Sequence, residues 1–296
     1  MRKITRYGLG IFVLLGVLAA AIGCTARGTG AQATTPLPPQ ERLRVATTTS
    51  LYDTGLWGYL EPIFEEQYDV ELDVLYAGTG IALEYGRRGD VDVIAVHSRS
   101  REETYVAEGY GVERVPFAYN YFLVVGPEGD PTGIKGMSPE DAFEKLIEDG
   151  TASFISRGDD SGTHGKEKTI WQGAGYDYET VQNAGEWYIE TGRGMGPTLL
   201  MASEKQGYTL VDMGTFLSFK GQIDLVPIVD EGAILLNVYS VIAGNPEANP
   251  KVNSEMAGNM VDFLTSPEIQ GLIGNYGTEE YGMTLFNPCA GAEPQS

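Results

Sequence analysis

Short apolar runs rich in β-branched residues alternate along this chain with amphipathic stretches of helical length. This alternation is typical of βα units built around mainly parallel sheets, so we predict an α/β protein. The predicted strands are 43–47, 70–76, 91–97, 152–156, 187–190, 208–212 and 225–229. The predicted helices are 55–67, 139–148, 195–205, 252–264 and 267–276.

Two segments interrupt the alternation and resemble each other. Residues 121–128 and 239–247 each read as a strand that runs into a Gly/Pro turn. We interpret them as two crossover strands that join two lobes, each a mainly parallel sheet flanked by helices, an arrangement suited to closing on a ligand. The first lobe is then 42–126 with 233–290, and the second is 127–232. The alternative is a single doubly wound domain with an inserted hairpin.

The N-terminal residues have the pattern of an export signal. Basic residues precede a mostly apolar stretch at 8–22, which is short for a membrane-spanning helix and typical of a secretory signal. The four residues that end at Cys24 resemble a lipoprotein cleavage box. We therefore expect 1–23 to be a signal peptide, a lipidated Cys24 to hold the protein to a membrane, and 24–41 to form a flexible tether. Ordinary secretion and a retained anchor are the alternatives.

The turn at 156–164 combines groups that together can grip a small oxyanion. It contains one guanidinium, two glycines and several hydroxyls, and we expect it to open a helix whose first N–H groups attract an anion. The alternatives are a surface Arg157 paired with Asp159 or Asp160, and hydroxyls that act only as helix caps. The candidate ligand-binding residues in this turn are Arg157, Ser161, Gly162 and Thr163.

Three predicted strands of the first lobe also end in polar residues. Ligands bind beyond the carboxyl ends of the strands in open α/β sheets, so these side chains are expected to face the turn at 156–164. Either Thr49 or Ser50 is expected to cap the helix that follows the first strand, and helix capping alone is the alternative for all of them. The candidates at this edge are Thr48, Thr49, Ser50, Thr79, Gly80 and Ser98.

The turn at 156–164 superficially resembles a serine-protease nucleophile loop. A triad needs a base within hydrogen-bond reach of the hydroxyl and an acid that orients the base. His164 follows Ser161 by three residues and should point along the helix, while the other histidine, His97, belongs to the first lobe. The sequence has no metal-ligand spacing, phosphate loop or dinucleotide fingerprint, and Cys289 reads as a buried thiol. We therefore predict that the protein is not an enzyme and has no cofactor and no protein-bound metal.

The charge of the chain excludes several partners. The sequence has 41 acidic and 20 basic residues, a formal net charge of −21. A field this negative opposes nucleic acid and other polyanions. It also opposes the entry of a small anion, so an anion pocket must use close, directed donors, and Arg157 matters more here than in a neutral protein. The carboxylates themselves are expected to form a solvated surface.

Taken together, these blocks resemble a known family. The segments 47–50 with Asp53 and 55–56, then 156–164, 194–199 and 208–210, are similar, in order, to the recurring blocks of the tungstate-binding lipoproteins of ABC importers, a branch of the type II periplasmic-binding-protein superfamily. The resemblance covers most of residues 43–288. It implies a type II periplasmic-binding-protein fold, a location outside the cytoplasm, and delivery of the ligand to a membrane permease. We expect a monomer anchored through Cys24.

The resemblance also has consequences for single residues. The residues that it places in contact with the oxyanion are Thr49, Ser50, Arg157 and Thr163. The chain departs from the family at Met213, where arginine is common, and at Gly207, where alanine is usual. The departure at Met213 puts in question whether a second cation helps to shape the second lobe.

Several tetrahedral oxyanions compete for such a site. Phosphate keeps a proton near neutral pH and gains from a carboxylate acceptor, whereas the same carboxylate repels tungstate, molybdate or sulfate. The direction of Asp159 and Asp160 therefore decides the class of ligand. The block at 47–50 favours tungstate or molybdate. The alternative ligand-binding function is a phosphate- or sulfate-binding receptor with the same turn. A different class of function is an anion sensor or adhesin-like surface protein that works without an importer.

Overall fold

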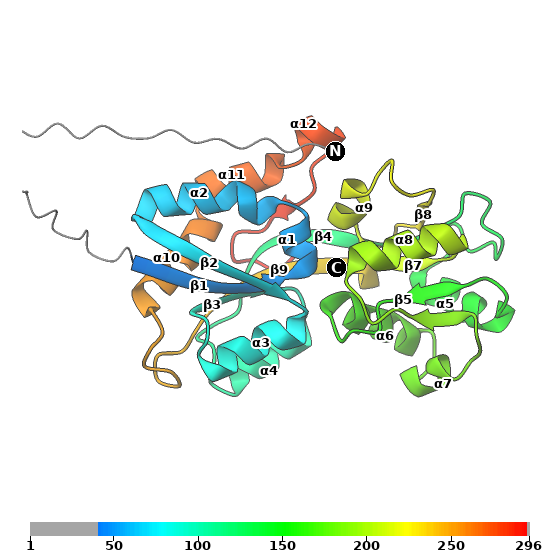
Figure 1. Cartoon of the computed structure of the whole chain (residues 1–296), viewed down its shortest axis with the longest axis horizontal. Coiled ribbons are helices and arrows are strands. Elements are labelled where there is room, and N and C mark those ends of the chain that lie inside the picture. The colour runs from blue at the N-terminus through cyan, green and yellow to red at the C-terminus, as the bar shows by residue number, and fades with distance from the viewer. Residues whose placement is uncertain (1–40, 295–296) are drawn as a thin grey trace, which may run out of the picture. The chain divides into compact units, whose positions relative to one another are not determined.

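The computed structural model describes residues 41–294, which lie in one compact unit. The predicted signal peptide (1–23), the lipidation site Cys24 and the tether lie outside the described residues, except that Glu41 begins the first strand. The described residues form two lobes, each with helices packed on a sheet (Figure 1). Within this part of the chain, no helix has the length and apolar character needed to cross a membrane.

The sheet of the first lobe places three strand ends at one edge. Its strands are β1 (Glu41–Thr48), β2 (Val70–Ala77), β3 (Val93–Val96), β4 (Val115–Gly126), β9 (Leu236–Ala243) and β10 (Asn287–Pro288), in the order β10-β4-β9-β3-β1-β2. β2 and β3 pair in parallel with the two sides of β1, and β9 lies antiparallel between β3 and β4. The carboxyl ends of β1, β2 and β3 therefore meet at the edge where ligands bind in such sheets.

The second lobe repeats this plan with shorter strands. They are β5 (Phe154–Ser156), β6 (Tyr188–Glu190), β7 (Thr209–Asp212) and β8 (Val226–Val229). β5 and β6 are parallel, and Phe154 forms a parallel bridge with Tyr208 just before β7. β7 and β8 pair antiparallel with the last part of β4. In each sheet, the parallel strands lie next to an antiparallel strand that crosses between the lobes, β9 in the first lobe and β4 in the second.

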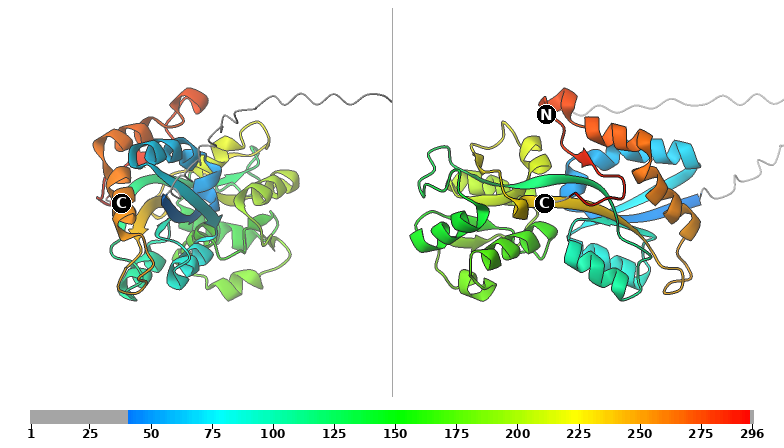
Figure 2. Two further views of the ribbon diagram at one scale, coloured as in Figure 1. Left: turned by 60° about the vertical axis from the view of Figure 1, so that its left-hand side comes forward. Right: turned by 180° about the vertical axis from the view of Figure 1, so that it is seen from behind.

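β4 belongs to both sheets. Its residues 115–121 pair with β9, whereas residues 122–126 pair with β7 and β8. β9 returns to the first lobe after a short 3-10 turn at Ala233–Leu235. β4 and β9 run side by side between the lobes (Figure 2), and they are the predicted crossover strands. The predicted lobe boundaries at 126/127 and 232/233 stay a prediction.

Helices cover both faces of each sheet. Those of the first lobe are α1 (Thr49–Asp53), α2 (Leu56–Tyr68), α3 (Thr79–Arg88), α4 (Arg99–Ala107), α10 (Ser254–Thr265), α11 (Pro267–Asn275) and α12 (Thr278–Tyr281). Those of the second are α5 (Pro139–Asp149), α6 (Gly162–Gly173), α7 (Tyr178–Gln182), α8 (Met195–Lys205) and α9 (Met213–Ser218). α2, α10 and α11 pack on one face of the first sheet, with α3 and α4 on the other. α5 and α6 share a core on one face of the second sheet, and α8 and α9 join the larger core on its other face.

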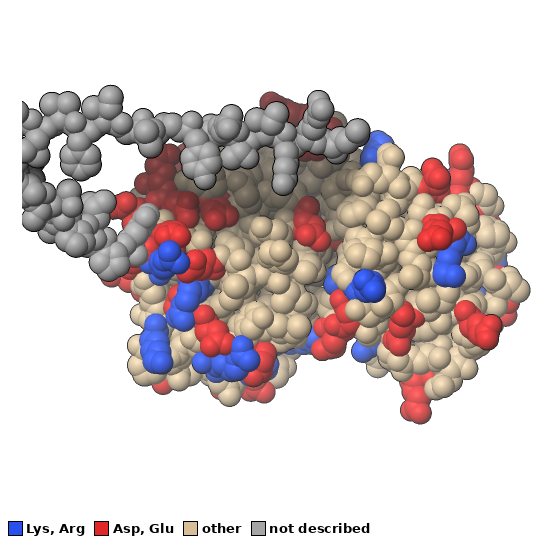
Figure 3. All heavy atoms as spheres, viewed as in Figure 1, with Lys and Arg blue, Asp and Glu red and all other residues tan. Residues whose placement is uncertain are grey.

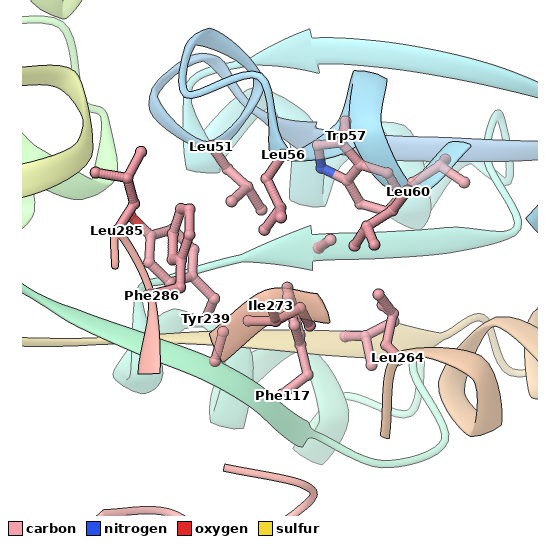
Figure 4. Close-up of a cluster of buried hydrophobic side chains, with 14 of the residues drawn as sticks. Leu51, Leu56, Trp57, Leu60, Phe117, Tyr239, Leu264, Ile273, Leu285 and Phe286 are labelled. Atoms are coloured by element: carbon pink, nitrogen blue, oxygen red, sulfur yellow. The ribbon is translucent and has the colours of Figure 1, made fainter. Parts of the chain in front are cut away.

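The alternation of side chains in β1 explains the two-sided core. Leu43 and Val45 point into the larger core, whereas Ala46 faces the side of α3 and α4. Figure 4 shows the larger core, with Trp57 and Leu60 of α2 on one side and Ile273 of α11 on the other. Each such side chain contributes about 1.5–3 kcal/mol by leaving water, so this burial fixes the strand ends that carry the site.

The predicted strands and helices are all present with shifted ends. Two predictions for single residues, the cap of α1 and the burial of Cys289, were wrong. Thr48, rather than Thr49 or Ser50, caps α1, because its hydroxyl accepts the N–H of Leu51 at 3.3 Å. The predicted buried thiol of Cys289 is only half-buried. Further helices, α3 and α4 among them, were not predicted as separate elements, since their apolar residues are few and widely spaced.

Candidate anion-binding site

His97, at the end of β3, decides how Ser50 can act. Its Nε2 lies 2.9 Å from Ser50 Oγ, and its Nδ1 lies 2.9 Å from Oδ1 of Asn237. The Asn237 amide nitrogen donates to Asn120 and Tyr239, so its oxygen is the acceptor. Nδ1 of His97 therefore carries the ring proton, and Nε2 accepts the Ser50 hydroxyl proton. What Ser50 retains for a ligand is its backbone N–H at the start of α1.

Gly162 and Thr79 bring the lobes into close contact. A Cβ atom on Gly162 would lie 2.7 Å from Cε1 of His97 and 3.0 Å from Oγ1 of Thr79, so only glycine permits this approach. The Thr79 hydroxyl is fully buried and has no hydrogen-bond partner among residues 41–294. A buried hydroxyl without a partner costs free energy unless a bound molecule satisfies it. Thr79 is therefore the first-lobe candidate with the clearest need for a ligand.

Arg157 is buried directly after β5, and one edge of its guanidinium makes only one long contact with the protein. Its Nε and Nη2 donate to Oδ2 of Asp159 at 3.1 and 2.6 Å, whereas Nη1 makes only a 3.5 Å contact with Oγ1 of Thr163. Because a guanidinium has five N–H donors, the Nη1 edge can serve an anion beside Thr163. Burial raises the pKa of Asp53 in the first lobe, and the nearby Arg157 charge opposes that rise. The charge of Arg157 therefore reaches the opposite lobe.

The two carboxylates of the turn are both engaged. Asp159 pairs with Arg157, and its Oδ1 accepts the N–H of Ser161 at 3.2 Å. Asp160 forms an ion pair with Arg101 of α4, which also donates to the Asp160 carbonyl at 3.0 Å. The Arg101 guanidinium lowers the pKa of the Asp160 carboxyl, so this group is ionised near pH 7. A guanidinium thus compensates the charge of each carboxylate, and this arrangement favours a dianion.

Three helices begin at this junction. α1 and α3 follow the carboxyl ends of β1 and β2, and α6 follows the Arg157 turn. The hydroxyl of Ser161 caps α6 by accepting the N–H of His164 at 3.2 Å, which leaves the N–H groups of Gly162 and Thr163 without a partner inside the helix. Gly78 precedes α3 and offers it no side-chain cap. Such N–H groups, at the positive ends of helix dipoles, attract anions.

His164 is not placed to act on the Ser161 hydroxyl. Its Nδ1 accepts the N–H of Asp160 at 3.0 Å, and its Nε2 lies 2.6 Å from the hydroxyl of Tyr178. Burial lowers the pKa of His164 to about 4 and that of His97 to about 4, so both imidazoles are neutral near pH 7. The turn therefore contains no nucleophile–base pair. Within residues 41–294, no group of three or more His, Cys, Asp or Glu side chains could hold a metal ion.

The acidity of the chain is mainly a surface property. On the face shown in Figure 3, acidic side chains lie around a largely uncharged middle of the first lobe. The buried carboxylates of the described chain are Asp92, Glu102, Glu167 and Asp212. Glu167 accepts hydrogen bonds from Ser156, Trp171 and Tyr188, and burial raises its pKa to about 7. Its role is to hold α6 against the second-lobe core.

The other sequence candidates lie at several places around the junction. Thr48 is buried as the cap of α1, and Thr49 is half-buried as the first residue of that helix. A Cβ atom on Gly80 would lie 3.1 Å from Oδ2 of Asp160 and 3.3 Å from Nη1 of Arg101, so this glycine also sits against the second lobe. That these residues contact a ligand stays a prediction.

Ser98 lies beside a different space. A cavity of about 550 Å³ is lined by Ser98 and His97 of the first lobe and by Gly162 and Lys166 of the second. Arg157 does not line this cavity. Burial lowers the pKa of Lys166 to about 8, and its ammonium donates to two carbonyl groups of the chain that leads into β9. Ser98 therefore shares this cavity with Gly162 of the turn, but not with Arg157.

Sequence reasoning missed two residues of the junction. Asn237 orients His97 but is one polar residue within a crossover strand, so no local pattern marks it. Arg101 lies in the first turns of α4, where a positive charge opposes the helix dipole. That mismatch is a signal for a partner elsewhere in the fold, and it could have been noticed.

A two-lobed α/β protein that brings donors from both lobes to one buried junction is a ligand-binding protein of the kind that closes on its ligand. The pattern of the family described as "PBP superfamily domain" matches residues 25–268. The chain belongs to this superfamily, and the predicted type II periplasmic-binding-protein fold is confirmed.

Similar proteins cover nearly the whole chain. The tungstate-binding protein TupA of Peptoclostridium acidaminophilum is 42% identical over 286 residues, which are 95% of this chain and 98% of that protein. The solved structure of the tungstate-binding protein TupA from Desulfovibrio alaskensis is 38% identical, covers 86% of this chain and 100% of its own, and has a TM-score of 0.73. The solved structure of the tungstate ABC transporter from Geobacter sulfurreducens is 46% identical, covers 80% of this chain and 99% of its own, and has a TM-score of 0.72.

Proposed function

We propose that the protein captures tungstate outside the cytoplasm and delivers it to the permease of an ABC importer. The observation that carries this proposal is the likeness to tungstate-binding proteins over nearly the full chain. The geometry of the junction agrees with that ligand, because both carboxylates beside Arg157 are engaged by cations and backbone groups. A phosphate-binding receptor, which gains from a free carboxylate, is therefore not favoured.

The proposed site uses one formal charge and several neutral donors. Arg157 supplies its Nη1 edge, and Thr79 and Thr163 supply hydroxyl groups. The first N–H groups of α1, α3 and α6 complete the set, with those of Thr49 and Ser50 among them. Closure of the lobes excludes water, so each donor acts in a medium of low dielectric constant. Molybdate has nearly the same size and charge as tungstate, and the same donors accept it.

Capture and release require no chemistry on the ligand. We therefore assign no catalytic residue and no cofactor to this protein. A lipidated Cys24 and the tether that follows it would keep the protein near its permease while leaving the lobes free to move. In this proposal the receptor acts as a monomer, since the donors of both lobes come from one chain.

A panel of oxyanions tests the ligand. Purified protein is heated with tungstate, molybdate, phosphate or sulfate, because a ligand at 100 times its Kd adds about 2.7 kcal/mol to the stability of the folded state. We expect tungstate and molybdate to raise the Tm strongly and sulfate and phosphate to leave it nearly unchanged. Preferential stabilisation by phosphate would overturn the proposal in favour of a phosphate receptor.

A transport assay tests the importer. Vesicles that contain the matching permease are supplied with tungstate, with and without the protein. We expect uptake that depends on both the protein and ATP. Tight tungstate binding without any stimulated uptake would point instead to an anion sensor at the cell surface.

A further inference from the structure

An ion pair joins the two lobes at the rim of the proposed site. Nη2 of Arg101, on α4 of the first lobe, pairs with the carboxylate of Asp160, in the turn that opens α6 of the second. Nη1 of the same guanidinium donates to the Asp160 carbonyl at 3.0 Å. Because its two partners belong to different lobes, this contact forms only when the lobes are together.

The Asp160 carboxylate is held close to the donors of the first lobe. Its Oδ2 lies 3.1 Å from the position of a Cβ atom on Gly80, in the first turn of α3 beside Thr79. The backbone of Asp160 is left-handed, with φ +57°, and its N–H donates to Nδ1 of His164 at 3.0 Å. The side chain itself is 65% exposed, and its direction is set by the pairing with Arg101. A carboxylate here without a cation would cancel part of the positive potential at the start of α3 and would repel a dianion.

Each carboxylate of the turn thus has its own guanidinium. Asp159 is compensated by Arg157 from its own lobe, and Asp160 is compensated by Arg101 from the other lobe. The sequence places these two carboxylates side by side, where together they would reverse the charge that Arg157 brings. The charge balance of the closed site therefore depends on an arginine that is outside the anion-binding turn.

We propose that Arg101 is a specificity-determining residue that makes the closed site accept a fully deprotonated dianion. It does so by neutralising Asp160 at the moment when the lobes meet. Without Arg101, the free carboxylate repels tungstate and offers an acceptor for the proton of phosphate, so the preference between the two anions narrows. This inference rests on the proposed function and names the residue that sets its selectivity.

Calorimetric titration of four forms of the protein tests this role. Tungstate and phosphate are titrated at pH 7.5 into the wild type, Arg101→Ala, Asp160→Asn and the double variant. We expect Arg101→Ala to weaken tungstate binding about five-fold, the upper range for a partly exposed ion pair, since the lost pair and the unpaired carboxylate both act against binding. Asp160→Asn should cost about three-fold or less, because asparagine tolerates the left-handed backbone. The double variant should bind tungstate within about two-fold of Asp160→Asn.

Arg99 provides a matched control. It lies on the same helix and carries the same charge, but it pairs with Glu103 and Glu293, which are not part of the second lobe. Arg99→Ala should change tungstate affinity less than about two-fold. An equal effect of Arg99→Ala and Arg101→Ala would overturn the inference, as would a double variant as weak as Arg101→Ala. Recovery of binding in the double variant excludes misfolding, and a wild type that binds no tungstate would end the proposed function instead.

Discussion

The two lobes bring opposite kinds of chemistry to the junction. Apart from Arg101 at the rim, the first lobe offers neutral groups: the first N–H groups of α1 and α3, a Ser50 hydroxyl that is bound to a neutral His97, and the Thr79 hydroxyl, which has no partner among residues 41–294. The second lobe offers the buried guanidinium of Arg157 together with the start of α6. The two lobes therefore have similar strand arrangements, but one provides neutral hydrogen-bond donors to the ligand and the other provides a charged donor.

This difference shows why neither half suffices as an anion site. In the second lobe the charge of Arg157 is compensated by Asp159, so the turn alone has little net attraction for a dianion. In the first lobe the Thr79 hydroxyl has no hydrogen-bond partner among residues 41–294. Only the closed arrangement combines a guanidinium edge with unused donors in a dry space. Variants on the two sides therefore test this division of roles between the lobes.

The largest expected effect comes from removing the charge of the second lobe. Arg157→Ala should weaken tungstate binding by about two orders of magnitude or more, because a buried charge-assisted hydrogen bond is lost and Asp159 remains unpaired. Calorimetric titration measures the change. Arg193→Ala, at an exposed position of the same lobe, is the control and should bind as the wild type does. Binding within a few-fold of wild type in Arg157→Ala would remove arginine from the mechanism.

A smaller effect is expected from separating the lobes by one methyl group. In Gly162→Ala the new Cβ would meet His97 at 2.7 Å and Thr79 at 3.0 Å, so closure is obstructed and tungstate affinity should fall about thirty-fold. Gly165→Ala, on the same helix, adds a methyl group with nothing within 4 Å and should leave the affinity unchanged. Equal affinities of the two variants would mean that closure does not bring these residues together.

Matched hydroxyl deletions compare the neutral donors of the two lobes. Thr79→Val should reduce tungstate affinity about ten-fold, the worth of one hydrogen bond in a dry site. The same change should raise the free energy of unfolding of the ligand-free protein by up to about 1 kcal/mol, since the lost hydroxyl has no hydrogen-bond partner within the described part of the chain.

Thr163→Val is the corresponding change in the second lobe. It should also cost about one decade in tungstate affinity, but without a gain in stability, because Thr163 already contacts Arg157. Urea denaturation and calorimetry separate the two quantities. A loss of stability in Thr79→Val would show that its hydroxyl has a partner in the ligand-free protein.

The smallest expected effect concerns pH. Burial lowers the pKa of His97 to about 4, below the ~6.5 of an unfolded histidine. As the pH falls, the unfolded state takes up the proton first, so this contribution to stability is complete above about pH 6.5 and is lost as the pH falls toward 4. Between pH 7.5 and 6 the loss is about 1 kcal/mol in the free energy of unfolding. His97→Gln should lack this part of the pH dependence. Urea denaturation at several pH values measures it, and the same change of unfolding free energy with pH in both proteins would refute the assignment.

The fold could be predicted from the sequence because its signals are local. The apolar runs at β1, β5 and β7 and the matching segments at β4 and β9 indicated an α/β protein with two crossover strands. The signals at Ser138 and Pro139 likewise marked the start of α5, where Ser138 accepts the N–H of Asp141 at 3.1 Å. Local patterns did not fix the length of β4, since its first part is recognised only by its pairing with β9.

The candidate site could be predicted only as a set of residue types at strand ends. The sequence marked Arg157 and Thr79, because each lies beside glycine just after a predicted strand, where ligands bind in open α/β sheets. It could not show that Ser50 donates to His97, since the tautomer is set by Asn237, 140 positions away along the chain. It likewise could not show the direction of Asp160, which depends on a cation from the opposite lobe. Such directions arise from tertiary contacts.

The continuity of β4 through both sheets limits how the molecule can open. A strand bonded to β9 on one stretch and to β7 and β8 on the next cannot slide lengthwise without breaking both ladders. Parting of the halves is therefore a flexing of β4 and β9 near residues 121–122 and 233–236. The stiffness of that two-stranded ribbon then limits the rate at which an enclosed ion dissociates.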